Sequence, residues 1–278
     1  MRDGDLWEEG VLAITSPHNP RIKELRRLRE RRHRERLGLF LVEGFKEISM
    51  ALEGGVGLVS LFFSREFFRG GEEDLLTSLK ARGVRLFSLP RSLFQKVSYR
   101  EHPDGLLAVA RKFPLDLGRL KLDPAPLVVV AEALEKPGNL GAILRCADAV
   151  GADAVVVCDP VVDPFNPNVV RASRGTLFTV KVALASSRET REWLEREGLE
   201  VVITSPHASE DYTRVDYTGP TAVVVGSESR GLSPPWLEGS FSRVAVPMLG
   251  KGDSLNVATA TAVVLYEALR QRRGEARL

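Results

Sequence analysis

Apolar residues recur along the chain with two different periods, and the changes of period predict alternating strands and helices. Short apolar runs bounded by turn residues are typical of strands, and spacings of three and four residues are typical of amphipathic helices. The runs predict strands over 39–42, 56–63, 84–89, 105–110, 127–131, 154–157, 177–182, 200–204, 222–225 and 244–246. The spacings predict helices over 21–36, 44–52, 72–82, 140–150, 189–197 and 255–270. This alternation predicts an α/β fold, with a mainly parallel sheet in the C-terminal part.

A segment without either period, residues 113–126, divides the chain into two parts. It contains Pro114, Pro124 and Pro126, and clustered prolines are typical of a linker. We therefore expect a small α/β domain over residues 1–115 and a larger domain over residues 123–278.

Basic residues concentrate in the first of these parts. Residues 1–122 hold 23 Lys+Arg and 17 Asp+Glu, a balance of +6, whereas residues 123–278 hold 16 and 20, a balance of −4. Segment 21–36 alone has nine basic and three acidic residues. Such a stripe favours a polyanionic partner over an ordinary solvated helix face, which is the alternative. The side chains expected to bind a nucleic acid are Arg21, Lys23, Arg26, Arg27, Arg31 and Arg32.

Composition and the absence of several motifs argue against membrane, secreted and metal-binding proteins and against several common enzyme classes. No apolar stretch approaches the ~20 residues that span a bilayer, and residues 1–10 lack the apolar core of a signal peptide, so we expect a cytoplasmic protein. Cys146 and Cys158 are too few for a disulfide scaffold and are expected to be reduced core residues. The four histidines lack metal-ligand spacing, so no metal is expected. No G-x-G-x-x-G follows a strand, and neither a P-loop nor a G-x-S-x-G motif is present.

Three segments of the second part place polar residues at expected strand ends and helix starts. Segment 139–149 puts Asn139 at a helix start and Arg145 on a different face of that helix. In segment 224–233 a buried strand runs into Gly226 and then Glu228. In segment 246–258 a glycine-containing loop leads into a helix.

Each segment also has an ordinary structural explanation. Arg145 could be an exposed helix residue, and segment 224–233 could be a turn with a helix cap at Ser233. Ser254 and Asn256, which we expect in the first turn of the last helix, are residues that commonly cap helices.

In this order and spacing, the three segments resemble the motifs of the SpoU, or TrmH-type, branch of the SPOUT RNA methyltransferases. They are similar to its N-x-G-A-x-x-R, G-S-E-x-x-G-L and P-M-x(n)-S-L-N-V-A motifs, and segment 171–178 is similar to its R-A-S-x-G-x-x-F stretch. Segment 19–44 resembles the substrate-binding domain of this branch, which has a ribosomal L30e-like fold. The resemblance covers nearly the whole chain.

The resemblance implies both a fold and an activity. The second domain would carry a trefoil knot, and the first would be the L30e-like RNA-binding domain. The protein would transfer a methyl group from S-adenosylmethionine to a ribose 2′-hydroxyl of RNA. We expect 23S ribosomal RNA as the substrate, with tRNA as the alternative. The protein would work as a homodimer through its C-terminal domain, with helix 255–270 in the interface.

The resemblance also implies the residues of the site. The residues expected to be catalytic are Arg145, Asn139, Glu228, Ser254 and Asn256, and backbone near Thr204, Gly226, Val246 and Leu255 would bind the cofactor. The family assigns activation of the 2′-hydroxyl to the arginine equivalent to Arg145. Because a guanidinium is effectively always protonated, we expect Arg145 to stabilise the developing alkoxide and to bind a neighbouring phosphate.

Two other functions fit the sequence less well. An RNA-binding protein that has lost activity would not need the intact polar residues of the three motifs. A dinucleotide-dependent enzyme on a parallel sheet would need the glycine fingerprint that is missing.

Overall fold

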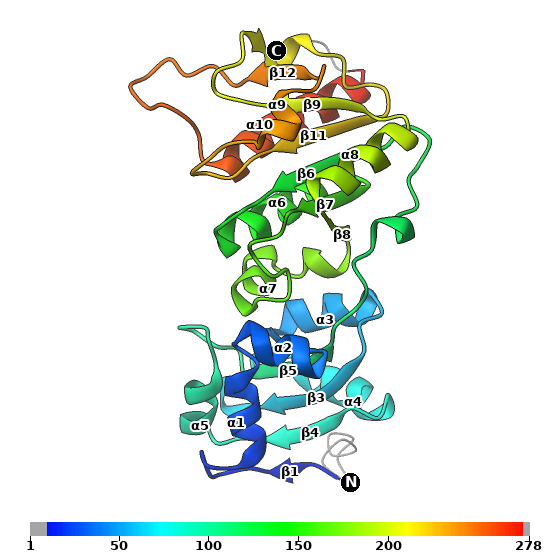
Figure 1. Ribbon diagram of the computed structural model, residues 1–278. Helices are drawn as coiled ribbons and strands as arrows, with labels where there is room; N and C mark the ends of the chain where they lie inside the picture. Colours follow the sequence, from blue (N-terminus) through cyan, green and yellow to red (C-terminus); the bar gives the residue numbers. More distant parts are fainter. Residues whose placement is uncertain (1–9, 275–278) are drawn as a thin grey trace. The chain divides into compact units, whose positions relative to one another are not determined.

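The computed structural model describes residues 10–274, which form two compact units (Figure 1). One unit comprises the described residues up to Phe113 together with Phe165–Thr179, and the other comprises Pro114–Pro164 and the residues from Val180 onward. The sequence pattern did not single out 165–179 as part of the first unit. The stretch that argued against a signal peptide, residues 1–10, lies outside the described residues except for Gly10.

The first unit is built on a five-stranded mixed sheet in the order β1-β4-β3-β5-β2. The pairs β1/β4 and β3/β4 are parallel, and the pairs β3/β5 and β2/β5 are antiparallel. Its elements are β1 (Leu12–Ala13), α1 (Pro20–Arg27), α2 (Arg31–Leu37), β2 (Leu39–Glu43), α3 (Phe45–Glu53), β3 (Leu58–Phe63), η1 (Arg65–Phe67), α4 (Glu72–Ala81), β4 (Arg85–Ser88), α5 (Arg91–Val97), β5 (Leu106–Arg111), α7 (Pro167–Ser173) and η3 (Thr176–Phe178).

The single helix predicted over 21–36 is wrong, because the chain forms two helices there. α1 ends at Arg27, and Glu30 is extended, with φ −90° and ψ 133°. The side chain of Arg34, only 1% exposed, donates hydrogen bonds to the carbonyl oxygens of Leu28 (3.0 Å) and Arg29 (2.7 Å). Arg34 therefore satisfies carbonyl groups at the end of α1, which a continuous helix would have paired internally.

The strand predicted over 177–182 is also wrong. Gly175 has φ +94°, a left-handed conformation that starts the 3-10 turn η3. Phe178 is buried, with its ring 6.1 Å from that of Phe40. The strand in this region, β8 (Lys181–Ala185), begins only after the turn. The apolar run 177–178 was thus a core contact rather than a strand.

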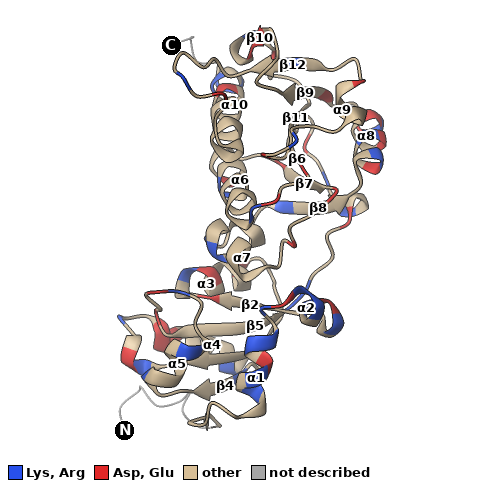
Figure 2. Cartoon of the chain, turned by 60° about the vertical axis from the view of Figure 1, so that its left-hand side comes forward, with Lys and Arg blue, Asp and Glu red and all other residues tan. Residues whose placement is uncertain are grey.

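The second unit is a seven-stranded sheet in the order β10-β12-β9-β11-β6-β7-β8, and every pairing is parallel. This confirms the predicted α/β class with a parallel sheet. Figure 2 shows α6 and α10 on one side of the sheet and α8 and α9 on the other. Besides β8, its elements are η2 (Leu117–Arg119), β6 (Leu127–Glu132), α6 (Pro137–Val150), β7 (Ala154–Cys158), α8 (Ser187–Arg196), β9 (Glu200–Thr204), β10 (Glu210–Asp211), η4 (Tyr212–Arg214), β11 (Thr221–Val225), α9 (Pro234–Leu237), β12 (Ser242–Ala245) and α10 (Val257–Arg272).

The neighbouring strands β6 and β11 end at the same level, since Ala131 pairs with Val225. The chain leaves β6 toward α6 on one face of the sheet and leaves β11 toward α9 on the other. Open parallel sheets bind ligands where adjacent strand ends diverge in this way. The topology therefore directs attention to the carboxyl ends of β6 and β11.

Within residues 10–274, no helix has the length and apolar character that crossing a membrane requires.

Candidate functional site

Side chains from the three motif segments meet at the carboxyl ends of β6 and β11. Asn139 lies in the first turn of α6, Glu228 in the loop after β11, and Asn256 directly before α10. Asn139 Nδ2 donates a hydrogen bond to Glu228 Oε1, and Asn256 Nδ2 donates to Asn139 Oδ1 at 3.1 Å. Asn256 Oδ1 also accepts from the N–H of Ala258 at 3.0 Å, which caps α10. A continuous hydrogen-bonded chain, the Glu228–Asn139–Asn256 chain, thus joins segments far apart in the sequence.

The second carboxylate oxygen of Glu228 has no partner. Oε2 is buried, and no described residue makes a hydrogen bond to it. A buried acceptor left unpaired is unfavourable by about 1–3 kcal/mol, so such atoms in native structures call for an explanation. A hydrogen-bond donor on a bound ligand would supply the missing partner.

Two glycines shape the loop that carries Glu228. Ser227 and Gly231 exchange two backbone hydrogen bonds, of 3.1 and 3.0 Å, which close the loop on itself. A Cβ atom at Gly226 would lie 2.3 Å from the carbonyl carbon of Gly231, and Gly231 itself has φ +66°. Both positions therefore require glycine, the first for close approach and the second for its backbone conformation.

Two acidic residues, one at the end of β6 and one just after it, hold the same loop, and sequence analysis missed both. Ser233 lies at the cap position of α9, but its side chain makes no capping hydrogen bond. Its hydroxyl donates instead to Glu132 Oε1 (2.5 Å), and its N–H donates to Glu132 Oε2 (2.8 Å). The hydroxyl of Ser229 donates to Glu135 Oε1. The one sequence signal for Glu132 is a carboxylate that ends an otherwise apolar strand.

Arg145 and Ser254 are not brought into the Glu228–Asn139–Asn256 chain. Both side chains are exposed, and among the described residues no hydrogen bond or ion pair joins either of them to it. Arg145 lies six residues beyond Asn139 on α6, about 9 Å along the helix axis and on a different face. Ser254 lies in the loop before α10, because the helix begins at Val257, so the prediction that it lies in the first turn was wrong.

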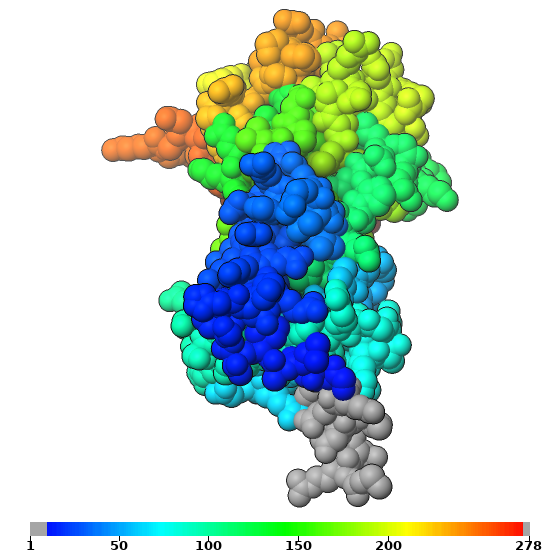
Figure 3. Space-filling view, turned by 60° about the horizontal axis from the view of Figure 1, so that its bottom comes forward, coloured from blue at the N-terminus to red at the C-terminus, as the bar shows by residue number. Residues whose placement is uncertain are grey.

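The loop between β12 and α10 projects from its unit. Met248 and Leu249 are exposed, Leu249 completely. Figure 3 shows this segment in orange, standing out from the surface. Ser254 is therefore carried on an open loop rather than on a packed element.

The positions expected to bind the cofactor lie at neighbouring strand ends. Thr204 ends β9, Gly226 follows β11 and Val246 follows β12, and these strands are adjacent in the order β12-β9-β11. The Thr204 hydroxyl donates to the carbonyl oxygen of Val224 at 3.2 Å. These three residues are half-buried, as is Leu255, which lies in the loop before α10. The arrangement fits a ligand that is held by backbone groups and that provides a donor for Glu228.

Metal chemistry receives no support from the described part of the chain. No group of three or more His, Cys, Asp or Glu residues within 10–274 could hold a metal ion. Both cysteines are free. Burial raises the pKa of the Cys158 thiol to about 11 and also raises the pKa of Cys146, so both thiols stay protonated near neutral pH.

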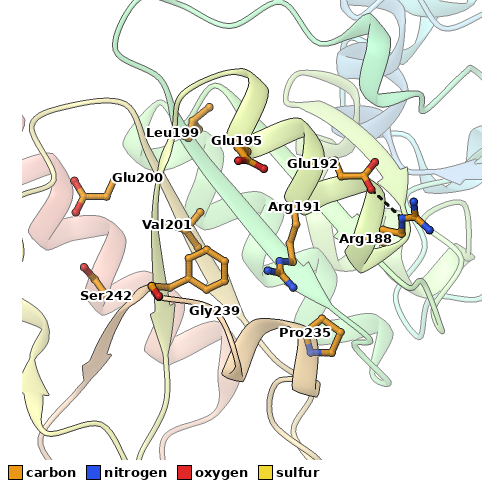
Figure 4. Close-up of a pocket in the computed structure, with 12 residues that line it drawn as sticks. Arg188, Arg191, Glu192, Glu195, Leu199, Glu200, Val201, Pro235, Gly239 and Ser242 are labelled. Carbon is orange, nitrogen blue, oxygen red and sulfur yellow. Dashed lines mark hydrogen bonds and ion pairs between the residues drawn. The ribbon is translucent and has the colours of Figure 1, made fainter.

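A separate hollow lies beside α8, β9 and segment 235–242 (Figure 4). The guanidinium of Arg191 lies 5.3 Å from the ring centre of Phe241, and Arg188 pairs with Glu192 at 2.8 Å. No residue predicted for the site lines this hollow. It is therefore distinct from the site at the ends of β6 and β11.

The basic residues of segment 21–36 lie on and between α1 and α2, where Figure 2 shows them in blue. Arg21 is half-buried, with its guanidinium 4.5 Å from the ring centre of Phe87, and Arg31 pairs with Glu35 at 2.7 Å. The remaining candidates are exposed, namely Lys23, Arg26, Arg27 and Arg32.

Family models and known proteins show the family to which the chain belongs. Residues 126–266 match the SpoU rRNA methylase family, and residues 19–108 match the MRM3-like substrate-binding domain. The chain is 35% identical to the 23S rRNA (uridine(2479)-2′-O)-methyltransferase of Streptomyces viridochromogenes, over 88% of this chain and 87% of that protein.

Solved structures extend the similarity to the fold. A crystal structure of an RNA 2′-O ribose methyltransferase is 42% identical, has a TM-score of 0.83, and matches 94% of this chain and 100% of its own. The AdoMet-bound rRNA methyltransferase from Sinorhizobium meliloti is 28% identical, has a TM-score of 0.86, and matches 94% of this chain and 98% of its own.

Proposed function

The chain belongs to the SpoU rRNA methylase family, and from this premise we propose that it methylates a ribose 2′-hydroxyl of 23S ribosomal RNA, with S-adenosylmethionine as methyl donor. The observation that carries the proposal is the Glu228–Asn139–Asn256 chain. It connects three motif segments at a diverging pair of strand ends, and it leaves one carboxylate oxygen without a partner.

The cofactor site would lie along the edge formed by Thr204, Gly226, Val246 and Leu255. S-adenosylmethionine supplies an electrophilic methyl group on a positively charged sulfur. Main-chain groups at these four positions would bind the cofactor. All four residues are half-buried; three lie at or next to neighbouring strand ends, and Leu255 lies just before α10. Glu228 Oε2 is placed to accept a hydrogen bond from the cofactor or from the ribose.

The roles of the polar residues follow from the charge that develops on the ribose oxygen. Asn139, Glu228, Ser254 and Asn256 would position the ribose. Arg145 would stabilise the developing alkoxide and bind a neighbouring phosphate with its planar guanidinium, while that phosphate or water accepts the proton. An exposed guanidinium that no described residue engages is available for such a role.

The two parts of the chain would have different functions, RNA binding and methyl transfer. Residues 1–115 would bind the RNA substrate, with the exposed cations of α1 and α2 contacting phosphates, and residues 123–278 would carry the methyltransferase site. The trefoil knot stays a prediction from the family, and a cytoplasmic location stays a prediction from the sequence.

We also propose that the protein is a homodimer through its C-terminal domain. Thr259, Val263 and Tyr266 lie at spacings of four and three along α10, on one face of the helix. They remain partly or fully open to solvent, and Tyr266 is 53% exposed. A symmetric partner would cover this face. Light scattering should show a dimer at micromolar concentration, and a monomer would contradict the proposal.

Labelled methyl transfer tests the activity and the substrate together. The protein is incubated with methyl-labelled S-adenosylmethionine and unmodified 23S rRNA, 16S rRNA or tRNA in separate reactions. Label should enter 23S rRNA, and the Asn139→Ala variant should lose most of it. Label in tRNA alone would move the substrate to the alternative class, and label in no RNA would contradict the proposed function.

A further inference from the structure

Glu132 is a buried carboxylate whose partners within the described chain are hydroxyl and amide donors rather than cations. It is the last residue of β6 and is 2% exposed. Its carboxylate accepts from the hydroxyl of Ser233 (2.5 Å) and the N–H of Ser233 (2.8 Å). The hydroxyl of Ser187 lies 2.6 Å from Glu132 Oε1 and also contacts the carboxylate of Asp159, so the two acids share its one proton. An acid is rarely kept fully buried, so the position of this one at the end of β6 suggests a specific use.

The two serines connect Glu132 to α9. Ser233 precedes α9 directly, and its hydroxyl is directed to Glu132 instead of to the backbone of that helix. The indole of Trp236, a fully buried residue of α9, donates to the hydroxyl of Ser187 at 3.3 Å. Glu132 thereby holds α9 at its first residues, once directly and once through Ser187.

This attachment determines where the loop with Glu228 ends. One end of the loop is fixed by β11, and its middle is closed by the two hydrogen bonds between Ser227 and Gly231. The other end is Ser233, two residues beyond Gly231, and it is held by Glu132. The contact between Glu228 and Asn139 therefore depends on a carboxylate that belongs to neither motif.

Glu132 also belongs to the strand that leads to Asn139. Asn139 lies seven positions after Glu132, and Glu135, within that stretch, accepts from Ser229. Segments 132–139 and 228–233 are thus joined by three separate side-chain contacts, through Glu132, Glu135 and Asn139.

We propose that Glu132 is a positioning residue for methyl transfer, which holds the loop after β11 so that Glu228 stays in contact with Asn139. The inference rests on the proposed function. Glu132 is sealed from solvent at the strand end, so it acts through Glu228 and does not touch the substrate. Displacement of reacting or orienting groups by about 1 Å can lower a rate by roughly 10²-fold, which makes such a support consequential.

A double-mutant cycle distinguishes positioning from general support of the fold. The single-turnover rate is measured at saturating S-adenosylmethionine and RNA for wild type, Glu132→Gln, Glu228→Gln and the double variant. Glu132→Gln should lower the rate by about 10–100-fold, with cofactor and RNA affinity within about threefold of wild type. In the Glu228→Gln background the same change should have less than about a twofold effect, because the group that Glu132 positions is already altered.

Two further variants keep the result interpretable. Ser233→Ala removes one hydroxyl and leaves the backbone donor, so it should reproduce a smaller loss even if Glu132→Gln folds poorly. Glu195→Gln alters an exposed carboxylate of α8, in the same unit and outside the site, and should leave the rate unchanged.

Equal rate losses in both backgrounds, or wild-type rates for Glu132→Gln and Ser233→Ala, would overturn the inference. An inactive wild-type protein would instead contradict the proposed function, so the two failures are distinguishable.

Discussion

Asn139 donates a hydrogen bond to the carboxylate of Glu228, 89 residues further along the chain. The contact joins the start of α6 to the loop after β11, and Asn256 extends it to the start of α10. Each of the three residues alone has an ordinary role as a cap or a loop residue. Their connection at the strand ends is what supports a common site.

Asn139 is the central member of the Glu228–Asn139–Asn256 chain. Asn139→Ala removes the donor to Glu228 and the acceptor for Asn256 together, so the single-turnover methylation rate should fall by about 10²-fold or more. Cofactor affinity should change little, since Asn139 is not among the positions expected to bind it. Glu195→Gln, an exposed residue of α8, is the control. Near-wild-type rates for Asn139→Ala would remove the chain from the mechanism.

Arg145 carries the proposed stabilisation of the alkoxide. Arg145→Ala should lower the single-turnover rate by about 10²–10³-fold while cofactor binding is retained. Arg145→Lys keeps the charge but loses the planar, two-pronged guanidinium, so it should restore only part of the rate. Arg196→Ala, at an exposed position of α8, should leave the single-turnover rate unchanged. If both substitutions at Arg145 are silent too, the residue is an ordinary surface arginine.

The exposed cations of α1 and α2 should set the affinity for RNA. Changing Arg26, Arg27, Arg31 and Arg32 together to Gln should weaken binding. It should also reduce the magnitude of the slope of log affinity against log salt by about 0.7–0.9 for each phosphate that is no longer neutralised, because fewer counterions are released. The measurement is the slope of log affinity against log salt, and Arg188→Gln on α8 is the control. An unchanged slope would mean that this face is only solvated.

Glu43 should make the stability of the first unit depend on pH. Burial raises the pKa of this carboxyl above 4.5, and hydrogen bonds from Ser98 and the N–H of Tyr99 offset the shift only in part. The folded state therefore binds more protons than the unfolded state in the window above pH 4.5, so wild type gains stability as the pH falls through it.

Glu43→Gln abolishes that titration and serves as the reference. Both proteins are unfolded in urea between about pH 7 and pH 5. The free energy of unfolding of wild type, relative to that of Glu43→Gln, should increase as the pH is lowered. A difference that stays constant, or that moves the other way, would contradict the burial argument.

The sequence predicted strands and helices correctly where the apolar residues of a segment follow a single period. The runs that became β6 and β11 are apolar on both faces because helices cover both sides of the sheet, and this pattern is legible in a single sequence. The start of α6 was predicted near Asn139, within the first turn of a helix that begins at Pro137, and the last helix was predicted from its long apolar spacing.

Tertiary contacts account for what the sequence left out. Arg34 looks like one more cation of a basic helix, but its side chain fills the break between α1 and α2. Ser233 has the form of a helix cap, and only the position of Glu132 shows that its hydroxyl turns elsewhere. The partner of Ser233 lies 101 positions away along the chain, and the partners of Arg34 lie across a break between two helices. Neither contact follows from the period of a strand or a helix.

The chemical identity of the product tests the central claim most directly. RNA methylated by the protein with labelled S-adenosylmethionine is hydrolysed in alkali, which cleaves every linkage that has a free 2′-hydroxyl. Methyl transfer to the ribose predicts that the label appears in an alkali-resistant dinucleotide, and that after complete enzymatic digestion it is found in a 2′-O-methylnucleoside. Label recovered in alkali-sensitive mononucleotides, with the methyl group on a base, would contradict the account.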